Sequence, residues 1–444
     1  MNAYAWRLRG ITTGLIILAL LVAGLSALGP VESRAEESLS LDELIAEGLE
    51  KSPEILAAQA RARAAGFRIP QAGSLPDPMF MFGYQNEGFD RINVGEQPNS
   101  NSQGIFSLSQ QFYYPGKRAL KGEMASKDAG SLVAMYEQTR LQVASKIKQL
   151  YYSLFLSYKT IDILKENGDL YARIEDAAAS RYASGMGTQE EVVMAQTEKY
   201  MLLEKEEMER QKIEAFQGML NATVGREATS PLGRPVLSAS TPFDMTLGDA
   251  LAAAQEHSPE IRSKQQMVEG AKAKIKMAEK EYYPDFAIAA GYFPRGGAFP
   301  PMWNLTATIN LPVFSKTRQS QALAEAQMGL AEAERELKAT ELMVSSNMRD
   351  AFSMLDSAGR LMKLYRDGLV PKASQDVELA FSGYATGKVE ALTVITRIRN
   401  LLDVDLLYWN QFVEREKAIA RLHEASGMGA REAPEKNGSG EREK

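Results

Sequence analysis

Two periods of hydrophobic and polar residues alternate along this chain. Between Met79 and Tyr84 aromatic residues occupy every second position, and between Ile105 and Tyr114 apolar residues alternate with Ser and Gln. A period of two is typical of a strand whose two faces meet different surroundings. These stretches, with the polar segment between them, predict a β-hairpin over about residues 79–114.

A helical period replaces the strand period at Lys117. Residues 117–184 contain no Pro, and their apolar positions recur every three or four residues, which predicts a helix about 100 Å long. The sequence Tyr-Ala-Ser-Gly-Met-Gly at 182–187 then places two Gly residues in a tight turn. We therefore expect an antiparallel helix over residues 188–223.

The second half of the chain repeats this order of elements. It predicts a β-hairpin over about residues 286–313, a long helix over 316–385 and a final helix over 388–426. The strand at 303–313 has the most regular alternation of the chain. Pro371 must kink or restart the long helix, because proline cannot donate the main-chain hydrogen bond. The turn before the final helix reads Tyr-Ala-Thr-Gly and lies 202 positions after its counterpart.

A short sequence is also written twice, at residues 41–55 and 247–261, with a spacing of 206. Each copy follows a hydroxyl residue that can form a capping box with an acidic residue three positions later, and each closes on Ser-Pro-Glu-Ile. Ser52 and Ser258 in this motif are predicted N-caps of a following helix, with Pro at the first helical position. The first of these helices is expected to end at Pro70.

This repetition indicates an internal duplication. We expect a first structural repeat over residues 39–225, a linker over 226–246, a second repeat over 247–427 and a disordered tail over 428–444. Residues 1–35 have the charged, apolar and small-residue regions of a cleaved signal peptide. The alternative is that their apolar run stays as a membrane anchor.

Composition narrows the chemistry that the chain can perform. A net charge of −6 provides no basic surface for nucleic acid. The absence of Cys excludes disulfides, a catalytic thiol and a lipid-modified anchor, and two His residues disfavour an imidazole metal site or triad. Met201 and Met208 share a helical face, but they do not form the clustered array of a copper site. We expect no cofactor, no metal site and no enzyme activity.

The predicted strands cannot close a barrel within one chain. Alternating strands are also typical of a soluble sandwich, but the export signal and the long flanking helices favour a membrane barrel. Because open strand edges are not tolerated in lipid, several chains must contribute strands. Three copies would supply 12 strands, and their helices would continue the barrel as a tube about 100 Å long. The predicted fold class is mainly α with a shared transmembrane β-barrel.

Together these features resemble the TolC-like outer-membrane efflux proteins, and among them the heavy-metal and multidrug members. The resemblance covers roughly residues 39–427 and rests on the duplicated order of elements, Ser-Pro-Glu-Ile, Pro-Gly-Lys-Arg at 115–118 and Tyr-x-x-Gly at both turns. It implies a homotrimer in outer-membrane lipid with a helical tunnel across the periplasm. It also implies docking to a periplasmic membrane-fusion adaptor that is coupled to an inner-membrane pump, with passive conduction of small molecules or metal ions.

The resemblance also implies roles for individual residues. Both turns would lie at the periplasmic tip and dock the adaptor, through Tyr182, Ser184, Gly185, Met186, Gly187, Tyr384, Thr386, Gly387 and Lys388. Thr393 and Thr396 stand where relatives can carry a pair of Asp at the entrance, and the nearest acids are Glu190, Glu191 and Glu390. A trimer would turn any inward-facing Glu into a ring that attracts cations. The alternative is that these acids only favour a helix N-terminus through its dipole.

Two other classes of protein share some of these features. A periplasmic adaptor or coiled-coil scaffold would also have an export signal and long helical hairpins, but it would nest one hairpin within β-rich domains. This chain has two tandem copies, with the strands at the opposite end from the turns. A secreted carboxylate hydrolase is disfavoured, because no paired acids follow a predicted strand.

Overall fold

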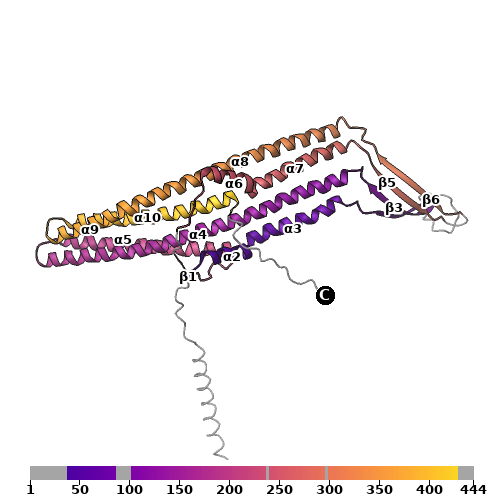
Figure 1. Ribbon diagram of the computed structural model, residues 1–444. Coiled ribbons are helices and arrows are strands. Elements are labelled where there is room, and N and C mark those ends of the chain that lie inside the picture. The colour runs from indigo at the N-terminus through magenta and orange to yellow at the C-terminus, as the bar shows by residue number, and fades with distance from the viewer. Residues whose placement is uncertain (1–37, 87–101, 237–239, 296–298, 429–444) are drawn as a thin grey trace, which may run out of the picture.

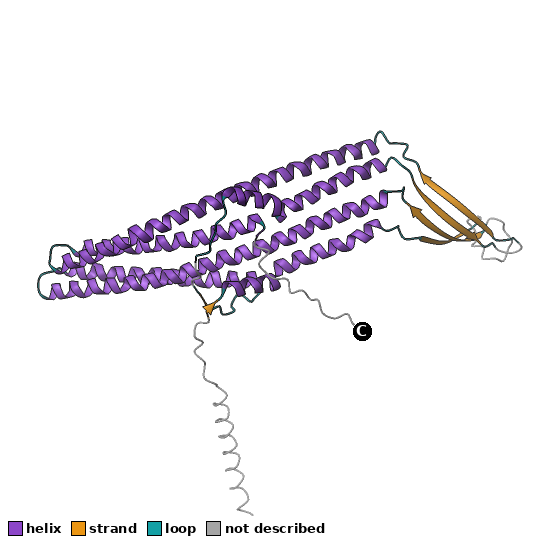
Figure 2. Ribbon diagram, in the orientation of Figure 1, coloured by secondary structure: helices purple, strands orange, loops and turns teal. Residues whose placement is uncertain are grey.

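The computed structural model describes residues 38–86, 102–236, 240–295 and 299–428. The molecule is elongated, with long helices along most of its length and a sheet at one end (Figures 1 and 2). The predicted signal peptide and the predicted tail beyond residue 428 lie outside the described residues. None of the described helices combines enough length with enough hydrophobicity to traverse a lipid bilayer.

The helices follow the same order in both halves of the chain. Those of the first half are α2 (Leu41–Lys51), α3 (Pro53–Gly73), α4 (Lys117–Ala183) and α5 (Gln189–Val224). Those of the second half are α6 (Leu247–His257), α7 (Pro259–Lys280), α8 (Gln319–Leu364), the π-helical η1 (Tyr365–Leu369), α9 (Val370–Ala385) and α10 (Ala391–Ser426). Helix α4 and the combined α8, η1 and α9 each span 67 residues, which are 117–183 and 319–385.

The helix starts differ in part from the sequence predictions. Thr246 and Asp249 form the complete capping box before α6. Ser52 and Ser258 occupy the N-cap positions of α3 and α7, but their buried side chains make no capping hydrogen bond, and each backbone N–H instead closes the preceding helix. The capping prediction is therefore wrong for these two side chains, because the helix junction around them is packed.

Other parts of the helices and strands also differ from expectation, and the final helix begins at Ala391 instead of 388. Helix α3 continues through Pro70 to Gly73, so this proline lies within the last turn and does not end the helix. The last strand ends at Asn310 and not at Val313, because Pro312 has no N–H for the ladder, and turns then delay α8 to Gln319. Near Pro371 the helix does not break. The helical turn before Pro371 instead widens into a π-helical turn, in which the N–H of Val370 donates to the carbonyl of Tyr365.

The sheet is antiparallel, with strand order β2-β3-β5-β6. Its strands are β2 (Met79–Gln85), β3 (Gln103–Phe112), β5 (Asp285–Phe293) and β6 (Met302–Asn310). The register aligns Phe82 with Phe106, Phe106 with Tyr292, and Tyr292 with Trp303 across all four strands. Because strand residues alternate between faces, one face carries mostly aromatic and aliphatic side chains, while the other combines Ser, Thr, Asn and Gln with Met, Ala and Gly.

The first described residues and the linker meet near the middle of the molecule. There β1 (Ser38–Leu39) pairs in parallel with β4 (Arg234–Pro235). The hydroxyl of Tyr151 in α4 lies 3.0 Å from the carbonyl oxygen of Leu39 and 2.9 Å from that of Val236. A buried cluster surrounds this point and joins α2, α3, α4, α5 and α10.

A second buried cluster lies at the end farthest from the sheet. It is formed by α4, α5, α9 and α10, and it includes the fully buried side chains of Tyr171, Tyr384 and Ile398. Both helical hairpin turns lie at this end (Figure 1). We call the two turns with the helix ends that flank them the tip, which spans residues 180–199 and 376–399.

Candidate functional site

The two turns of the tip have the same main-chain geometry. In the first turn, Gly185 has φ +71°, and the N–H of Met186 donates to the carbonyl of Arg181 at 2.8 Å. In the second, Gly387 has φ +72°, and the N–H of Lys388 donates to the carbonyl of Gly383 at 2.9 Å. A positive φ at this position explains why both Tyr-x-x-Gly motifs end in Gly.

The hydroxyl residues of the motifs support the helix ends. Ser184 Oγ donates toward the carbonyls of Ser180 and Arg181, at 3.1 and 3.0 Å. Thr386 Oγ1 makes the equivalent contacts 202 residues later, at 3.2 and 3.0 Å. These carbonyls also accept main-chain N–H groups, so the hydroxyls add a second hydrogen bond at each helix end and stabilise the turns.

The two Tyr residues of the motifs have opposite environments. Tyr182 is 51% exposed and lies at the surface, whereas Tyr384 is 1% exposed. The hydroxyl of Tyr384 donates to Glu191 Oε2 at 2.8 Å. Burial, followed by this hydrogen bond and the negative charge of Glu191, raises the pKa of Tyr384 to about 12. The phenol is therefore protonated at neutral pH and serves as a donor.

Arg181 connects the first turn to the second and was not singled out from the sequence. Its Nη1 donates to the carbonyl of Tyr384 and its Nη2 to the carbonyl of Met186, each at 3.0 Å. The guanidinium carbon also lies 4.8 Å from the centre of the Tyr384 ring. The only sequence signal is that the first turn has Arg where the second has Gly383.

The predicted entrance residues are divided between two environments. Glu191 follows the N-cap Thr188 and contacts Tyr384, as described above. The others are exposed at the starts of α5 and α10: Glu190, Glu390, Thr393 and Thr396. Of these predicted entrance residues, Glu191 therefore forms a hydrogen bond between the two halves of the chain.

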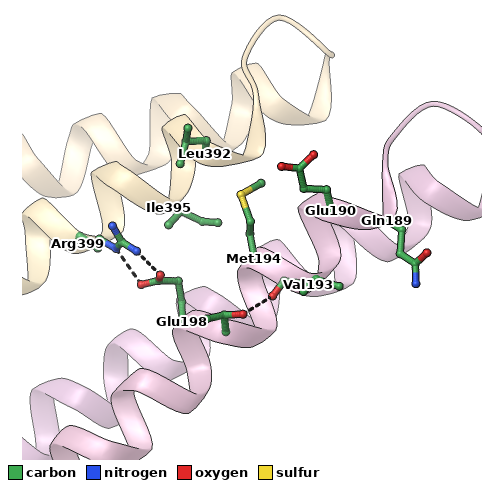
Figure 3. A pocket seen from close by; sticks show the side chains of 9 residues that line it. Gln189, Glu190, Val193, Met194, Glu198, Leu392, Ile395 and Arg399 are labelled. Carbon is green, nitrogen blue, oxygen red and sulfur yellow. Dashed lines mark hydrogen bonds and ion pairs between the residues drawn. The ribbon is translucent and has the colours of Figure 1, made fainter.

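A groove of about 410 Å³ separates the starts of α5 and α10. Met194 and Ile395 lie between the two helices, and Glu190 lies at the start of α5, nearer the turn (Figure 3). Below them Arg399 forms two hydrogen bonds with the buried carboxylate of Glu198, one of them 2.8 Å long. Burial and the nearby charge of Glu198 raise the pKa of Tyr171. The pair of Arg399 and Glu198 was also missed, because its partners are 201 residues apart.

The described residues were also compared with the requirements of a metal-binding site. Across the described ranges, no group of three or more His, Asp and Glu side chains is placed to hold a metal ion. The tip instead consists of hydrogen bonds, ion pairs and a buried apolar cluster, which are features of a structural joint.

A protein-family model described as outer membrane efflux protein matches residues 44–218 and 250–427. The nickel-cobalt-cadmium resistance protein NccC of Alcaligenes xylosoxydans is 23% identical over 342 residues, with 74% of this chain and 73% of the relative covered. The pyoverdine export outer membrane protein OpmQ of Pseudomonas putida is 23% identical over 428 residues, with 89% and 87% covered.

Solved structures show the same fold. The outer membrane protein VceC of Vibrio cholerae matches with a TM-score of 0.74 and 19% identity, covering 87% of this chain and 96% of that one. CusC, described for its transmembrane channel formation, matches with a TM-score of 0.71 and 16% identity, covering 87% and 92%. These comparisons confirm the predicted resemblance and do not favour the adaptor alternative.

Proposed function

The chain belongs to the outer membrane efflux protein family, and we propose that this outer-membrane efflux channel works as a homotrimeric duct coupled to a periplasmic adaptor and an inner-membrane pump. Cargo would pass from the pump through the helical tunnel and the barrel by passive conduction, without a catalytic step.

The sheet supports the trimer. Its outer strands β2 and β6 each have one edge with no neighbour among the described strands, and every residue of both strands is exposed. Open edges of this kind cannot persist in lipid, so each must pair with another copy. Three copies of a sheet of four strands would close a barrel of 12.

The two faces of the sheet support a water-filled lumen. The cross-strand register places Ser, Thr, Asn and Gln side chains together on one face, among them Ser107, Ser109, Gln111, Asn304, Thr306 and Thr308. The opposite face carries exposed apolar side chains, among them Phe80, Phe82, Leu108, Trp303, Leu305 and Ile309. In a closed barrel, the first face would line the channel and the second would contact lipid.

The tip supports adaptor docking. Tyr182 and Met186 of the first turn are 51% and 68% exposed, and Lys388 of the second turn is exposed as well. The docking set then comprises both turns: Tyr182, Ser184, Gly185, Met186, Gly187, Tyr384, Thr386, Gly387 and Lys388. Tyr384 would act from within the joint, since its side chain is buried.

The exposed acids would act at the entrance. Glu190 and Glu390 stand at the starts of α5 and α10, with Thr393 and Thr396 on the following turns of α10. In a trimer each Glu that faces the axis becomes a ring of three charges, which would favour cations. Glu191 would contribute mainly through its hydrogen bond to Tyr384.

The decisive experiment combines fractionation with conductance. We expect the full-length protein to require detergent, to have the native mass of a trimer and to form pores in planar bilayers. A soluble periplasmic monomer would refute the duct. Deleting the gene and comparing sensitivity to nickel, cobalt and cadmium with sensitivity to organic toxicants would then identify the cargo, since NccC is named for the first class.

A further inference from the structure

The internal duplication lets a contact within the chain predict a contact between copies. Helix α4 packs on α10, which is the returning helix of the following repeat. Because α8 repeats α4, it should pack in the same way on the returning helix of the repeat that follows it. In a closed ring of duplicated chains, that helix is α5 of the partner subunit.

The register between α4 and α8 follows from their buried residues. At the turns the two repeats are offset by 202 residues, and the buried Ala178 and Ala380 keep this offset. Three buried residues of α4 have buried counterparts in α8 at an offset of 201 instead: Val143 and Val344, Ile147 and Met348, and Ser157 and Ala358. The π-helical η1 lies between the two regions and holds the extra residue, because a π turn closes its hydrogen bond over one residue more than an α turn. Helices α5 and α10 each span 36 residues and keep the offset of 202 from end to end.

The contact of α4 with α10 is aromatic, and we call it the internal seam. The ring centre of Phe155 lies 5.8 Å from that of Trp409 and 6.1 Å from that of Phe412. Lys159 places its Nζ atom 5.2 Å from the centre of the Trp409 ring. Phe155 and Phe412 are buried, so this part of the internal seam excludes water.

Charged residues occupy the corresponding positions of α8. At the offset of 201, Phe155 corresponds to Asp356 and Lys159 corresponds to Arg360. Asp356 and Arg360 form an ion pair across one helical turn, and their side chains remain 54% and 71% exposed. An exposed pair of this kind contributes little to the single chain, and both groups keep free positions for a further partner.

Charged residues also replace the aromatic residues of α10 in α5. At the offset of 202, Trp409 corresponds to Glu207 and Phe412 corresponds to Arg210. Both charged residues are exposed in the single chain. Arg210 also forms an ion pair of 2.7 Å with Glu206 on its own helix, which leaves the rest of its guanidinium fork available.

We propose that an ionic seam joins neighbouring copies of the channel at the height where the aromatic internal seam joins the two halves of each chain. Asp356 pairs with Arg210 of the partner subunit, as the contact of their aromatic counterparts dictates. Arg360 pairs with Glu207 of the partner subunit for the same reason. Both pairs join opposite charges, although the register was set by buried residues elsewhere on the helices. This inference rests on the proposed function, because it needs the closed trimer.

Cross-linking tests the placement, since the chain contains no Cys. Full-length protein in detergent, carrying Asp356→Cys and Arg210→Cys in the same chain, is treated with a short bifunctional thiol reagent. Helices α4 and α10 lie between α5 and α8 within one chain, so a link joins separate copies and appears as covalent dimer and trimer on a denaturing gel. The control replaces Arg210→Cys by Lys212→Cys, which is also exposed but lies on the other side of α5. We expect at least about tenfold more linked product from the first pair, because thiols held at one seam react at a high effective concentration.

A charge exchange tests whether the seam is ionic. Asp356→Arg with Arg360→Asp keeps the ion pair within α8 but presents reversed charges to the partner subunit. We expect the trimer to dissociate in SDS at a lower temperature than wild type. Adding Glu207→Arg with Arg210→Glu to the same chain should recover about half of the shift or more, because the two exchanges are coupled.

The chain offers a matched control for the charge exchange. Glu269 and Lys272 form an exposed ion pair of 2.8 Å on α7, which packs between α4 and α8 of one chain. Glu269→Lys with Lys272→Glu should therefore leave the dissociation temperature of the trimer unchanged.

Each outcome decides a different point. Linking through position 210 that is no stronger than linking through position 212 would overturn the inference and leave the duct intact. If either Cys prevents trimer formation, Arg360→Cys with Glu207→Cys is compared with Arg360→Cys and Lys205→Cys, and equal linking would again overturn it. An unchanged dissociation temperature after the exchange on α8 would overturn the ionic pairing. A wild-type protein that is a monomer would instead refute the proposed function.

Discussion

The junction between α2 and α3 leaves no room for a side chain at Gly225, which is the residue that ends α5. Gly225 has φ +89°, and a Cβ atom there would lie 2.6 Å from the carbonyl oxygen of Lys51. The second half repeats this arrangement at Gly427, with φ +74° and 2.5 Å to the carbonyl oxygen of His257. A backbone atom cannot swing away as a side chain can, so the junction itself must shift.

Replacing Gly185 distinguishes the two energetic costs of such a substitution, which are backbone strain and overpacking. It also has a positive φ, +71°, but no atom lies within 4 Å of the Cβ position. Gly185→Ala should therefore cost only the left-handed backbone conformation, about 1 to 2 kcal/mol. Gly225→Ala and Gly427→Ala should add the cost of overpacking, which is typically about 1 to 3 kcal/mol, for a total of roughly 2 to 5 kcal/mol.

The measurement is guanidinium unfolding of the detergent-solubilised protein, followed by far-ultraviolet circular dichroism of the helices. We expect the midpoint to fall in the order wild type, Gly185→Ala, then Gly225→Ala and Gly427→Ala together. Equal midpoints for Gly185→Ala and Gly225→Ala would show that the close contact with the carbonyl oxygen of Lys51 does not destabilise the Gly225→Ala variant. A clear difference between Gly225→Ala and Gly427→Ala would show that the two junctions are not equivalent.

Two further predictions concern charged side chains outside the membrane-spanning strands. Lys117 is 2% exposed and lies 3.0 Å from Asp285, so Lys117→Ala should destabilise the joint between helices and sheet by roughly 3 kcal/mol and lower the yield of native trimer. Lys121→Ala removes a partly exposed cation and should leave the yield of native trimer unchanged. Equal yields from both variants would contradict this reasoning. Arg226→Ala should cost about 1 kcal/mol at neutral pH, because hydrogen bonds from Arg226 hold the pKa of Glu47 below its ordinary value of 4.5. A lowered carboxylate pKa stabilises the fold above 4.5 and loses its effect as the pH falls through the lowered value, so the unfolding midpoints of wild type and Arg226→Ala should converge in acid, and a constant gap would refute the assignment.

The candidate site was only partly predictable. The motifs located both turns, and the positive φ at Gly185 and Gly387 follows from a rule that acts within a few residues. The motifs did not distinguish Tyr182 from Tyr384, although one is exposed and the other is buried. The environment of Tyr384 depends on Arg181 and Glu191, which lie about 200 residues from Tyr384 along the chain. Sequence spacing alone carries no information on such a contact.

The sequence by itself determined what depends on local geometry. Alternation of apolar residues established the strands, their helical spacing established the long helices, and the doubled stretch at 41–55 and 247–261 established that the chain is duplicated. These features need only the preferred backbone geometry of a few successive residues.

Tertiary structure alone decided how the two copies differ. The sequence predicts that the side chains of Ser52 and Ser258 cap a helix. In the structure, packing at the helix junction buries both of them without a capping hydrogen bond. The same Tyr-x-x-Gly motif yields a surface Tyr in one copy and a buried hydrogen-bond donor in the other. The physical reason is that burial and hydrogen-bond partners arise from segments brought together by folding, and identical local sequences meet different neighbours there.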